Sequence, residues 1–132
     1  MQNVTSYRVI YGDTDRMGVV YYANYLRWFE IGRTEFLREI GLPYSKIEEA
    51  GLHFPVTEVS CRYLKSARYD DMIKIETELA SAGRATLTFN YTISKQDDGS
   101  PLALGSTKHA CVDAGGRIAR IPRMLAQLLG AA

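Results

Sequence analysis

The chain has 132 residues and is 46% hydrophobic, which predicts one domain over residues 1–132 with a core that needs neither disulfides nor a metal. Its 16 basic and 15 acidic residues give a net charge of +1, which argues against a dedicated nucleic-acid surface. It has no run of about 20 apolar residues for a membrane helix and no signal-peptide pattern, so we expect a cytoplasmic protein. Its only two cysteines, Cys61 and Cys111, make no disulfide framework, and we expect both to be reduced and packed in the core.

The first predicted element is a strand over residues 4–11. Tyr7, Val9 and Tyr11 recur there with the period of two that places side chains on one face. A loop rich in acids, glycine and tyrosine follows, within the sequence YGDTDRMGVVYYANYLRWFE of residues 11–30. A change of direction alone does not require such varied residues, so this loop is the first candidate for function.

Residues 22–40 show a helical period. Apolar or aromatic residues mostly recur there at spacings of three and four, and the stripe comprises Tyr22, Leu26, Phe29, Arg33, Phe36 and Ile40. Because Trp28 and Ile31 lie outside this stripe, the helix is expected to be buried on more than one side. Gly32 in its middle predicts a close backbone contact, and Gly41 and Pro43 predict its end.

Strands dominate the rest of the chain, after a short second helix over residues 44–50. Alternating side chains and turn residues predict strands over 56–64, 72–80, 85–95 and 102–113, a turn toward 117–121, and a closing helix from Pro122. A strand, a long helix and a run of antiparallel strands make an α+β fold in which the helix fills the concave face of a curved sheet.

Metal and serine-type chemistry both fit the sequence poorly. Residues 13–18 begin like a calcium loop, but Met17 and Asn24 occupy positions that should hold ligands. His53 and His109 are too isolated for a zinc site, so no metal and no cofactor are expected. The chain has no G-x-S-x-G motif, and His109 falls in a predicted strand, where a structural role is the simpler interpretation.

A carboxylate beside a helix N-terminus fits better. The first N–H groups of a helix have no internal partner and, with the helix dipole, stabilise an oxyanion. If the helix begins near Tyr22, its N–H groups can polarise a carbonyl, and Asp15 can fold back toward them with Gly18 as the bend. A thioester suits this arrangement because thiolate leaves readily and a weak base suffices. The alternative is that Asp13 and Asp15 only hydrogen-bond the loop or cap the helix.

The quoted stretch also resembles the opening motif of hotdog-fold acyl-CoA thioesterases. The similar group is the 4-hydroxybenzoyl-CoA thioesterase family, including the thioesterases associated with the Tol-Pal system. Their motif is an acid, two spacers, a glycine, apolar residues, an aromatic residue and a tyrosine near the helix start, matched here by Asp15, Gly18, Val19, Val20, Tyr21, Tyr22 and Tyr25. Segments 33–41 and 63–71 also resemble the family, so the similarity covers essentially the whole chain.

The resemblance implies a hotdog fold whose subunits pair through their sheets, as homodimers or homotetramers with active sites between two protomers. It implies that Asp15 is the catalytic carboxylate, as nucleophile or general base, and that the backbone N–H of Tyr22 polarises the carbonyl. It places Gly18 at the bend and Tyr25 among the substrate-binding residues. Tol-Pal-associated members commonly carry histidine where this chain has Tyr22. Because this chain has no imidazole there, the difference favours a role for the Tyr22 backbone N–H, and it leaves the substrate open.

Coenzyme A needs cations for its phosphates, and the resemblance points to Lys65 and Arg84 for this role. Glu35 on the helix is expected to be structural, paired with Arg38 or Arg33. A non-catalytic acyl-CoA-binding hotdog protein is the alternative function. A hydratase is disfavoured because the helix has no histidine. The acyl group, and coenzyme A against acyl carrier protein as the carrier, are left open.

Overall fold

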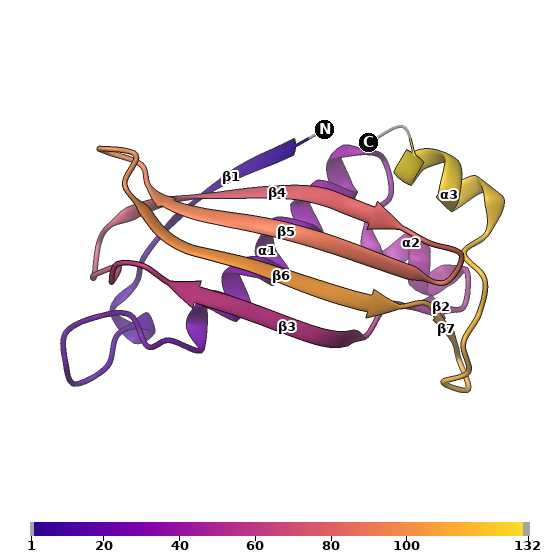
Figure 1. The fold of residues 1–132 in the computed structure, drawn as a ribbon, viewed down its shortest axis with the longest axis horizontal. Coiled ribbons are helices and arrows are strands. Elements are labelled where there is room, and N and C mark those ends of the chain that lie inside the picture. Colours follow the sequence, from indigo (N-terminus) through magenta and orange to yellow (C-terminus); the bar gives the residue numbers. More distant parts are fainter. Residues whose placement is uncertain (1, 131–132) are drawn as a thin grey trace.

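A five-stranded antiparallel sheet with a long helix across one face forms the body of the protein (Figure 1). The structure is a computed structural model that describes residues 2–130. The strand order is β1-β4-β5-β6-β3, and the long helix is α1 (Asn24–Glu39). The strands are β1 (Gln2–Arg8), β3 (Val56–Tyr63), β4 (Met72–Ala82), β5 (Thr86–Lys95) and β6 (Pro101–Ala110). This arrangement confirms the predicted α+β hotdog fold.

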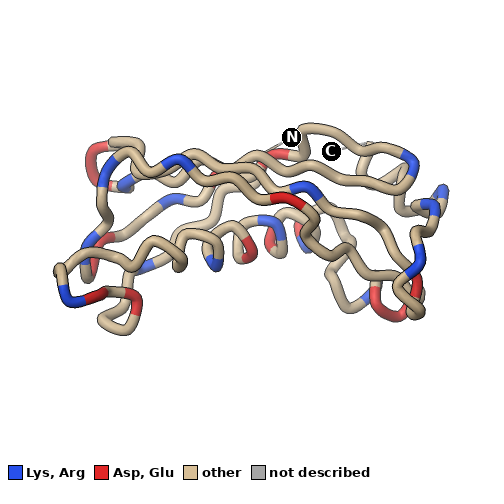
Figure 2. Tube along the Cα trace, turned by 60° about the horizontal axis from the view of Figure 1, so that its bottom comes forward, with Lys and Arg blue, Asp and Glu red and all other residues tan. Residues whose placement is uncertain are grey.

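Smaller elements cover the two ends of the sheet. They are the 3-10 turn η1 (Tyr11–Asp13), the helices α2 (Tyr44–Glu49) and α3 (Arg123–Gly130), and the short pair β2 (Leu52–His53) and β7 (Val112–Asp113). Lys, Arg, Asp and Glu are interspersed along the chain trace (Figure 2). Within residues 2–130 no helix has the length and apolar character needed to cross a bilayer.

The core lies between α1 and the sheet, because the strands alternate buried and solvent-facing side chains. Phe29 stacks on Tyr91 with ring centroids 4.4 Å apart and planes 9° apart. Gly32 confirms the expected close contact, since an added Cβ would lie 2.8 Å from Ile75 Cγ2 and closer still to Thr77 Oγ1. An alanine there would overpack the contact between helix and sheet.

Several predicted boundaries were wrong, each for a local reason. β1 ends at Arg8 and not at residue 11, because the Ile10 N–H turns to the Asp13 carboxylate (3.0 Å) and the chain enters η1. The long helix starts at Asn24 and not at residue 22, after a turn closed by Asn24 N–H to Tyr21 O (2.9 Å). The strand expected over 102–113 divides into β6 and β7, and β7 pairs with the unpredicted β2.

The predicted helix stripe was partly wrong. Phe29 and Phe36 are buried, but Leu26 is exposed and Trp28 is fully buried. The row of α1 residues that enters the core comprises Tyr25, Trp28, Phe29, Gly32, Phe36 and Leu37.

Strand β3 forms an open edge of the sheet. Among residues 2–130 it pairs only with β6, and Val56, Val59 and Tyr63 are 45%, 48% and 45% exposed. Tyr22, just before α1, and Leu26 on α1 are exposed as well, and Glu30 and Arg33 follow Leu26 on the same helix face at spacings of four and three. We call this strip between helix and edge strand the α1–β3 seam. An apolar sheet edge of this kind favours pairing with another strand.

Candidate active site

Asp13 anchors the loop between β1 and α1. Its side chain is fully buried, and it accepts hydrogen bonds from Tyr7 Oη (2.8 Å), Ile10 N (3.0 Å) and Arg27 Nη1 (3.1 Å). Its backbone oxygen accepts the Tyr21 N–H (2.9 Å) and the Asn24 side-chain amide (2.8 Å). One buried residue therefore ties the end of β1 to the start of α1. This is the structural role that the sequence left open for Asp13.

Asp15 lies in a tight hairpin. Asp15 N–H donates to Val19 O (2.9 Å) and Gly18 N–H donates to Asp15 O (3.0 Å). Gly18 has a φ of +78°, a conformation that glycine adopts without strain, so it does provide the bend. The Met17 N–H donates to Asp15 Oδ1 (2.8 Å). Among the hydrogen bonds of residues 2–130, none uses Asp15 Oδ2, and the side chain is partly exposed.

The start of α1 presents two N–H groups that lack a protein acceptor within the described chain, those of Tyr22 and Ala23. Tyr21 O accepts the Asn24 N–H (2.9 Å), so this carbonyl points along the helix. In a planar trans peptide the N–H points opposite to the carbonyl. The Tyr22 N–H therefore points out of the helix start, as a donor for an oxyanion must.

Tyrosines form one wall of the site. Tyr63 Oη donates to Tyr22 O (2.9 Å) and so fixes the peptide that carries the Ala23 N–H. Tyr25 is buried, accepts the Ala67 N–H (3.1 Å) and packs edge-on against Tyr63 with centroids 5.1 Å apart. Burial, then the hydrogen bond and proximity to Cys61, raise the pKa of Tyr63 to about 12. Tyr63 therefore stays protonated at neutral pH and acts as a donor.

These groups line one open cleft of about 310 Å³. Four of the six predicted site residues line it: Asp15, Tyr22, Tyr25 and Lys65. Gly18 shapes the hairpin beside it. The other lining residues are Met17, Val19, Val20, Tyr63, Leu64 and Ser66.

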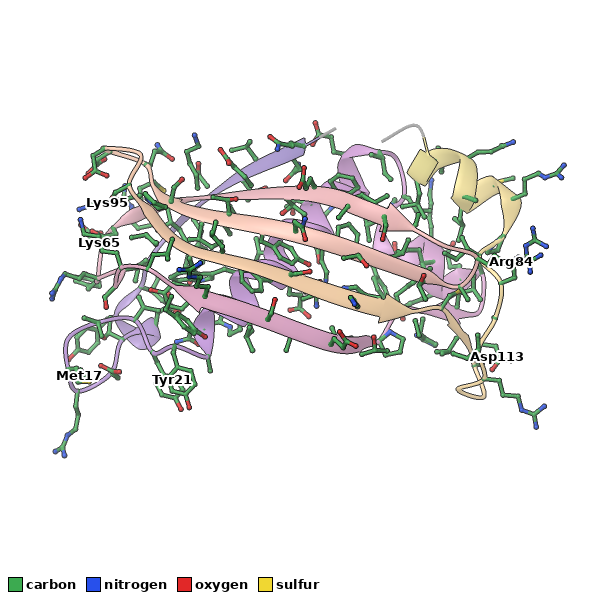
Figure 3. The ribbon with its side chains drawn as sticks, viewed as in Figure 1. Met17, Tyr21, Lys65, Arg84, Lys95 and Asp113 are labelled. Carbon is green, nitrogen blue, oxygen red and sulfur yellow. The ribbon has the colours of Figure 1, made fainter. Side chains whose placement is uncertain are left out.

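Arg84 does not join this cleft within one protomer. It follows β4 at the far end of the sheet, whereas Lys65 lies at the end with Met17 and Tyr21 (Figure 3). There it lines a separate open cavity of about 790 Å³ with Arg120 and Arg123. An Arg84 role in the site therefore requires a second protomer.

The remaining candidates have structural partners. His109 is buried, its Nδ1 lies 2.9 Å from Phe54 O and its Nε2 lies 2.8 Å from Thr107 Oγ1, which confirms the structural interpretation. Glu35 pairs with Arg38, as expected. In the part of the chain that the structure describes, no cluster of three or more His, Cys, Asp or Glu residues has a geometry for metal.

Sequence reasoning missed Ala23, Tyr63 and the partners of Asp13. Ala23 presents only a backbone N–H at the helix start, so its residue type carries no signal. Tyr63 lies 41 residues from Tyr22, and only the fold brings them together. The pair of acids in the motif was the available signal for Asp13, but it did not tell which acid is buried.

The fold is that of a hotdog thioesterase. Residues 9–129 match the profile of the thioesterase-like superfamily, and the chain belongs to this family. It is 38% identical to the acyl-CoA thioesterase YbgC of Haemophilus influenzae, over 82% of this chain and 79% of that one.

Solved structures agree with this assignment. A hypothetical protein from Thermus thermophilus has a TM-score of 0.93 at 36% identity, covering 99% of this chain and 97% of the other. The DHNA-CoA thioesterase from Staphylococcus aureus has a TM-score of 0.92 at 29% identity, covering 98% and 87%.

Proposed function

We propose that this protein hydrolyses acyl-CoA thioesters to a free acid and coenzyme A. One observation carries the proposal: the Asp15 carboxylate and the Tyr22 N–H, which has no acceptor in the described chain, meet in one open cleft. A carboxylate beside unpaired helix N–H groups suits acyl transfer from a good leaving group. Membership of the thioesterase-like superfamily and 38% identity to an acyl-CoA thioesterase support the same reaction.

The thioester carbonyl would accept the Tyr22 N–H, with the Ala23 N–H beside it. Asp15 would then act in one of two ways. As a nucleophile, its oxygen attacks the carbonyl carbon, the C–S bond breaks and a mixed anhydride forms, which water cleaves. As a general base, it takes a proton from water while the water oxygen attacks. Both routes release the acid and a thiol.

The two effects have known sizes. One oxyanion donor contributes about 10²–10³ in rate, and a positioned base contributes about 10²–10⁴. The donor here belongs to the backbone at a helix start, so its position does not depend on a side-chain rotamer. Asp15 is also pre-positioned, because Met17 N–H holds one of its oxygens (2.8 Å).

The functional unit would be a homodimer, or a tetramer of two such dimers, joined through β3. The strand is an open edge with exposed Val56, Val59 and Tyr63, and a twofold axis would pair it with its own copy. The pairing would also bring the partner's Arg84 end toward the Asp15 end of this protomer. Lys65 from the same protomer and Arg84 from the partner subunit are then candidates for the phosphates of coenzyme A. A cytoplasmic location stays a prediction.

The direct test is thiol release from a panel of benzoyl and aliphatic acyl-CoAs, by wild type and Asp15→Asn in parallel. Asparagine keeps an oxygen for the Met17 N–H, so the hairpin is preserved while the charge is lost. We expect turnover by the wild type and a loss of at least about 100-fold in kcat for the variant. Circular dichroism and the unfolding midpoint control for folding. Binding of acyl-CoA without thiol release by either protein would instead identify a non-catalytic acyl-CoA-binding protein.

A further inference from the structure

Asn24 is the first residue of α1, and the mechanism proposed above gives it no role. Its side chain is half-buried. It does not occupy the capping position of the helix, which belongs to Ala23 and has no side-chain capping bond. Instead the Asn24 side chain reaches back along the chain and donates to Asp13 O (2.8 Å). A carbonyl only accepts, so the amide nitrogen makes this bond.

Asn24 also holds the peptide that presents the Tyr22 N–H. Its backbone N–H donates to Tyr21 O (2.9 Å), and the Tyr21 N–H donates to Asp13 O (2.9 Å). With the side-chain bond, these contacts form a closed ring of hydrogen bonds through Asp13, Tyr21 and Asn24. Because the peptide between Tyr21 and Tyr22 is planar, holding Tyr21 O also sets the direction of the Tyr22 N–H.

The same ring bears on the separation between the Asp15 carboxylate and the Tyr22 N–H. Both lie in the loop of residues 13–24, and Asp13 O joins the two ends of that loop through its bond with Asn24. The Asp13 end is firmly held, because its side chain is fully buried and accepts three hydrogen bonds. A shift of the helix start relative to Asp15 therefore stretches the Asn24 bond.

We propose that Asn24 is a positioning residue for thioester hydrolysis, and that its side-chain bond to Asp13 O holds the Tyr22 N–H at the place of the thioester oxygen. The proposal rests on the proposed function and adds a residue to its machinery. Asn24 does not line the Asp15 cleft, so it acts through the backbone of its neighbours. Without its bond, both reacting groups remain but are misaligned, and a displacement of about 1 Å can cost about 100-fold in rate.

Two substitutions remove the bond in different ways. Asn24→Ala deletes the amide and introduces the residue with the highest helix propensity. Asn24→Asp keeps the size of the side chain but sets an ionised oxygen, which cannot donate, against Asp13 O, while the negative charge in the first turn favours the helix. We expect kcat for an acyl-CoA to fall about 10-fold in both, with KM within about 2-fold of wild type. Asn90→Ala, at an exposed asparagine of β5, is the matched control.

A purely structural role for Asn24 predicts a different result. The unfolding midpoint would fall, but kcat per folded molecule would stay at the wild-type value. Thermal unfolding gives the folded fraction at the assay temperature, and Asn24→Asp serves if Asn24→Ala does not fold, because its charge supports the helix start. A kcat within about 2-fold of wild type in the folded variants would overturn the proposal.

The vibration of the bound thioester carbonyl reports on the donor without any turnover. An acyl-CoA with an isotopically labelled carbonyl carbon is bound to Asp15→Asn, and infrared difference spectra locate its C=O band. A hydrogen bond from the Tyr22 N–H weakens the C=O bond and lowers the frequency of this band. We expect the addition of Asn24→Asp or Asn24→Ala to Asp15→Asn to move the band back toward its position in free acyl-CoA. An unchanged band would overturn the proposal.

Failure of this proposal is distinguishable from failure of the proposed function. If wild type releases no thiol from any acyl-CoA, the hydrolase proposal fails. If thiol is released but the Asn24 variants keep the wild-type kcat and an unshifted carbonyl band, only the positioning role of Asn24 fails.

Discussion

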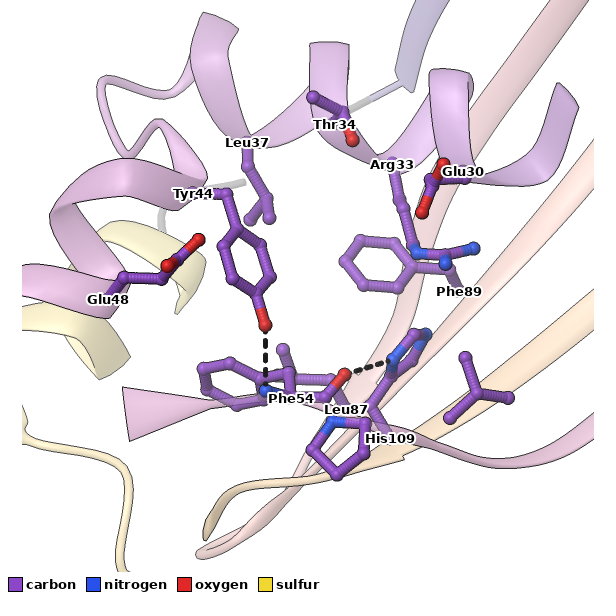
Figure 4. A pocket seen from close by; sticks show the side chains of 12 residues that line it. Glu30, Arg33, Thr34, Leu37, Tyr44, Glu48, Phe54, Leu87, Phe89 and His109 are labelled. Carbon is purple, nitrogen blue, oxygen red and sulfur yellow. Dashed lines mark hydrogen bonds between the residues drawn. The ribbon is translucent and has the colours of Figure 1, made fainter. Parts of the chain in front are cut away.

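The two ends of the α1–β3 seam are built in opposite ways. At the Asp15 end, a carboxylate and backbone N–H groups without an acceptor in the described chain lie at an open cleft of about 310 Å³. At the Arg33 end, apolar side chains and a satisfied hydrogen-bond chain surround a cavity of about 440 Å³. The Asp15 end therefore holds the unpaired groups that make it the candidate catalytic end, whereas the buried polar groups at the other end, such as His109 with Phe54 O (Figure 4), are already paired with one another. The open edge strand β3 connects the two ends, since Val56 lines one cavity and Tyr63 lines the other.

After the Asp15 substitution itself, the largest expected effect comes from the anchor of the Asp15 end. Asp13→Asn replaces a buried carboxylate that accepts three side-chain and backbone donors. We expect a loss of about 2 kcal/mol in unfolding free energy, the scale of a hydrogen bond to a charged group, and a fall in kcat of about 10-fold or more because the Asp15 loop shifts. Urea denaturation and thiol release measure the two effects. Full activity with intact stability would show that the anchor is dispensable.

A smaller effect should follow from Tyr63→Phe. This change removes the hydroxyl that donates to Tyr22 O (2.9 Å) while keeping the ring against Tyr25. We expect kcat to fall about 3- to 10-fold, the equivalent of one hydrogen bond of roughly 1 kcal/mol, with little change in stability. Tyr69→Phe, on an exposed tyrosine outside the cleft, is the matched control. An unchanged kcat would mean that the hydrogen bond from Tyr63 is not needed to position the start of α1.

Substitutions that remove a positive charge test whether coenzyme A carries the acyl group. Lys65 lies at the Asp15 end and Arg84 at the far end (Figure 3). If both contact the phosphates of coenzyme A, Lys65→Ala and Arg84→Ala should each raise KM for an acyl-CoA about 3-fold, because exposed ion pairs contribute little. KM for the matching acyl-pantetheine, which lacks the nucleotide, should not change. Equal effects on both substrates would remove these residues from phosphate binding.

The smallest effect concerns His109 at the Arg33 end. Burial, followed by the Arg33 charge, lowers its pKa in the folded state. Below its ordinary value of about 6.5, the unfolded chain therefore takes up a proton that the folded chain does not, and stability falls as the pH drops. We expect His109→Gln to flatten this loss between pH 7.5 and 5.5, by less than about 1.4 kcal/mol per pH unit. An unchanged slope, or the same flattening in the exposed His53→Gln control, would contradict the interpretation.

The sequence predicted those features that depend on neighbouring residues. The period-two patterns over 72–80 and 85–95 correspond to β4 and β5, and the helical period found α1. The end of β1 was missed because the alternation continues through Tyr11, whereas the buried Asp13 side chain draws Ile10 out of the strand. The helix start was placed too early because Tyr22 fits the helical pattern but lies in a turn.

The site was predictable in part, for the same reason. Asp15, Gly18 and Tyr22 lie within eight residues of one another, so a motif can specify them. Lys65 lines the same cleft because the chain that follows β3 passes beside it. Arg84 was grouped with them by its charge and by the resemblance to the family, and no pattern in one sequence states which end of a sheet a hairpin occupies. Arg33 was predicted only as part of a helix stripe and as an alternative partner of Glu35, because the cavity that it lines exists only in the folded chain.

The most direct test of the account is a crystal structure of Asp15→Asn with an intact acyl-CoA bound. The account predicts a thioester oxygen within hydrogen-bond distance of Tyr22 N or Ala23 N, with the carbonyl carbon facing residue 15. A thioester bound away from the helix start would contradict it.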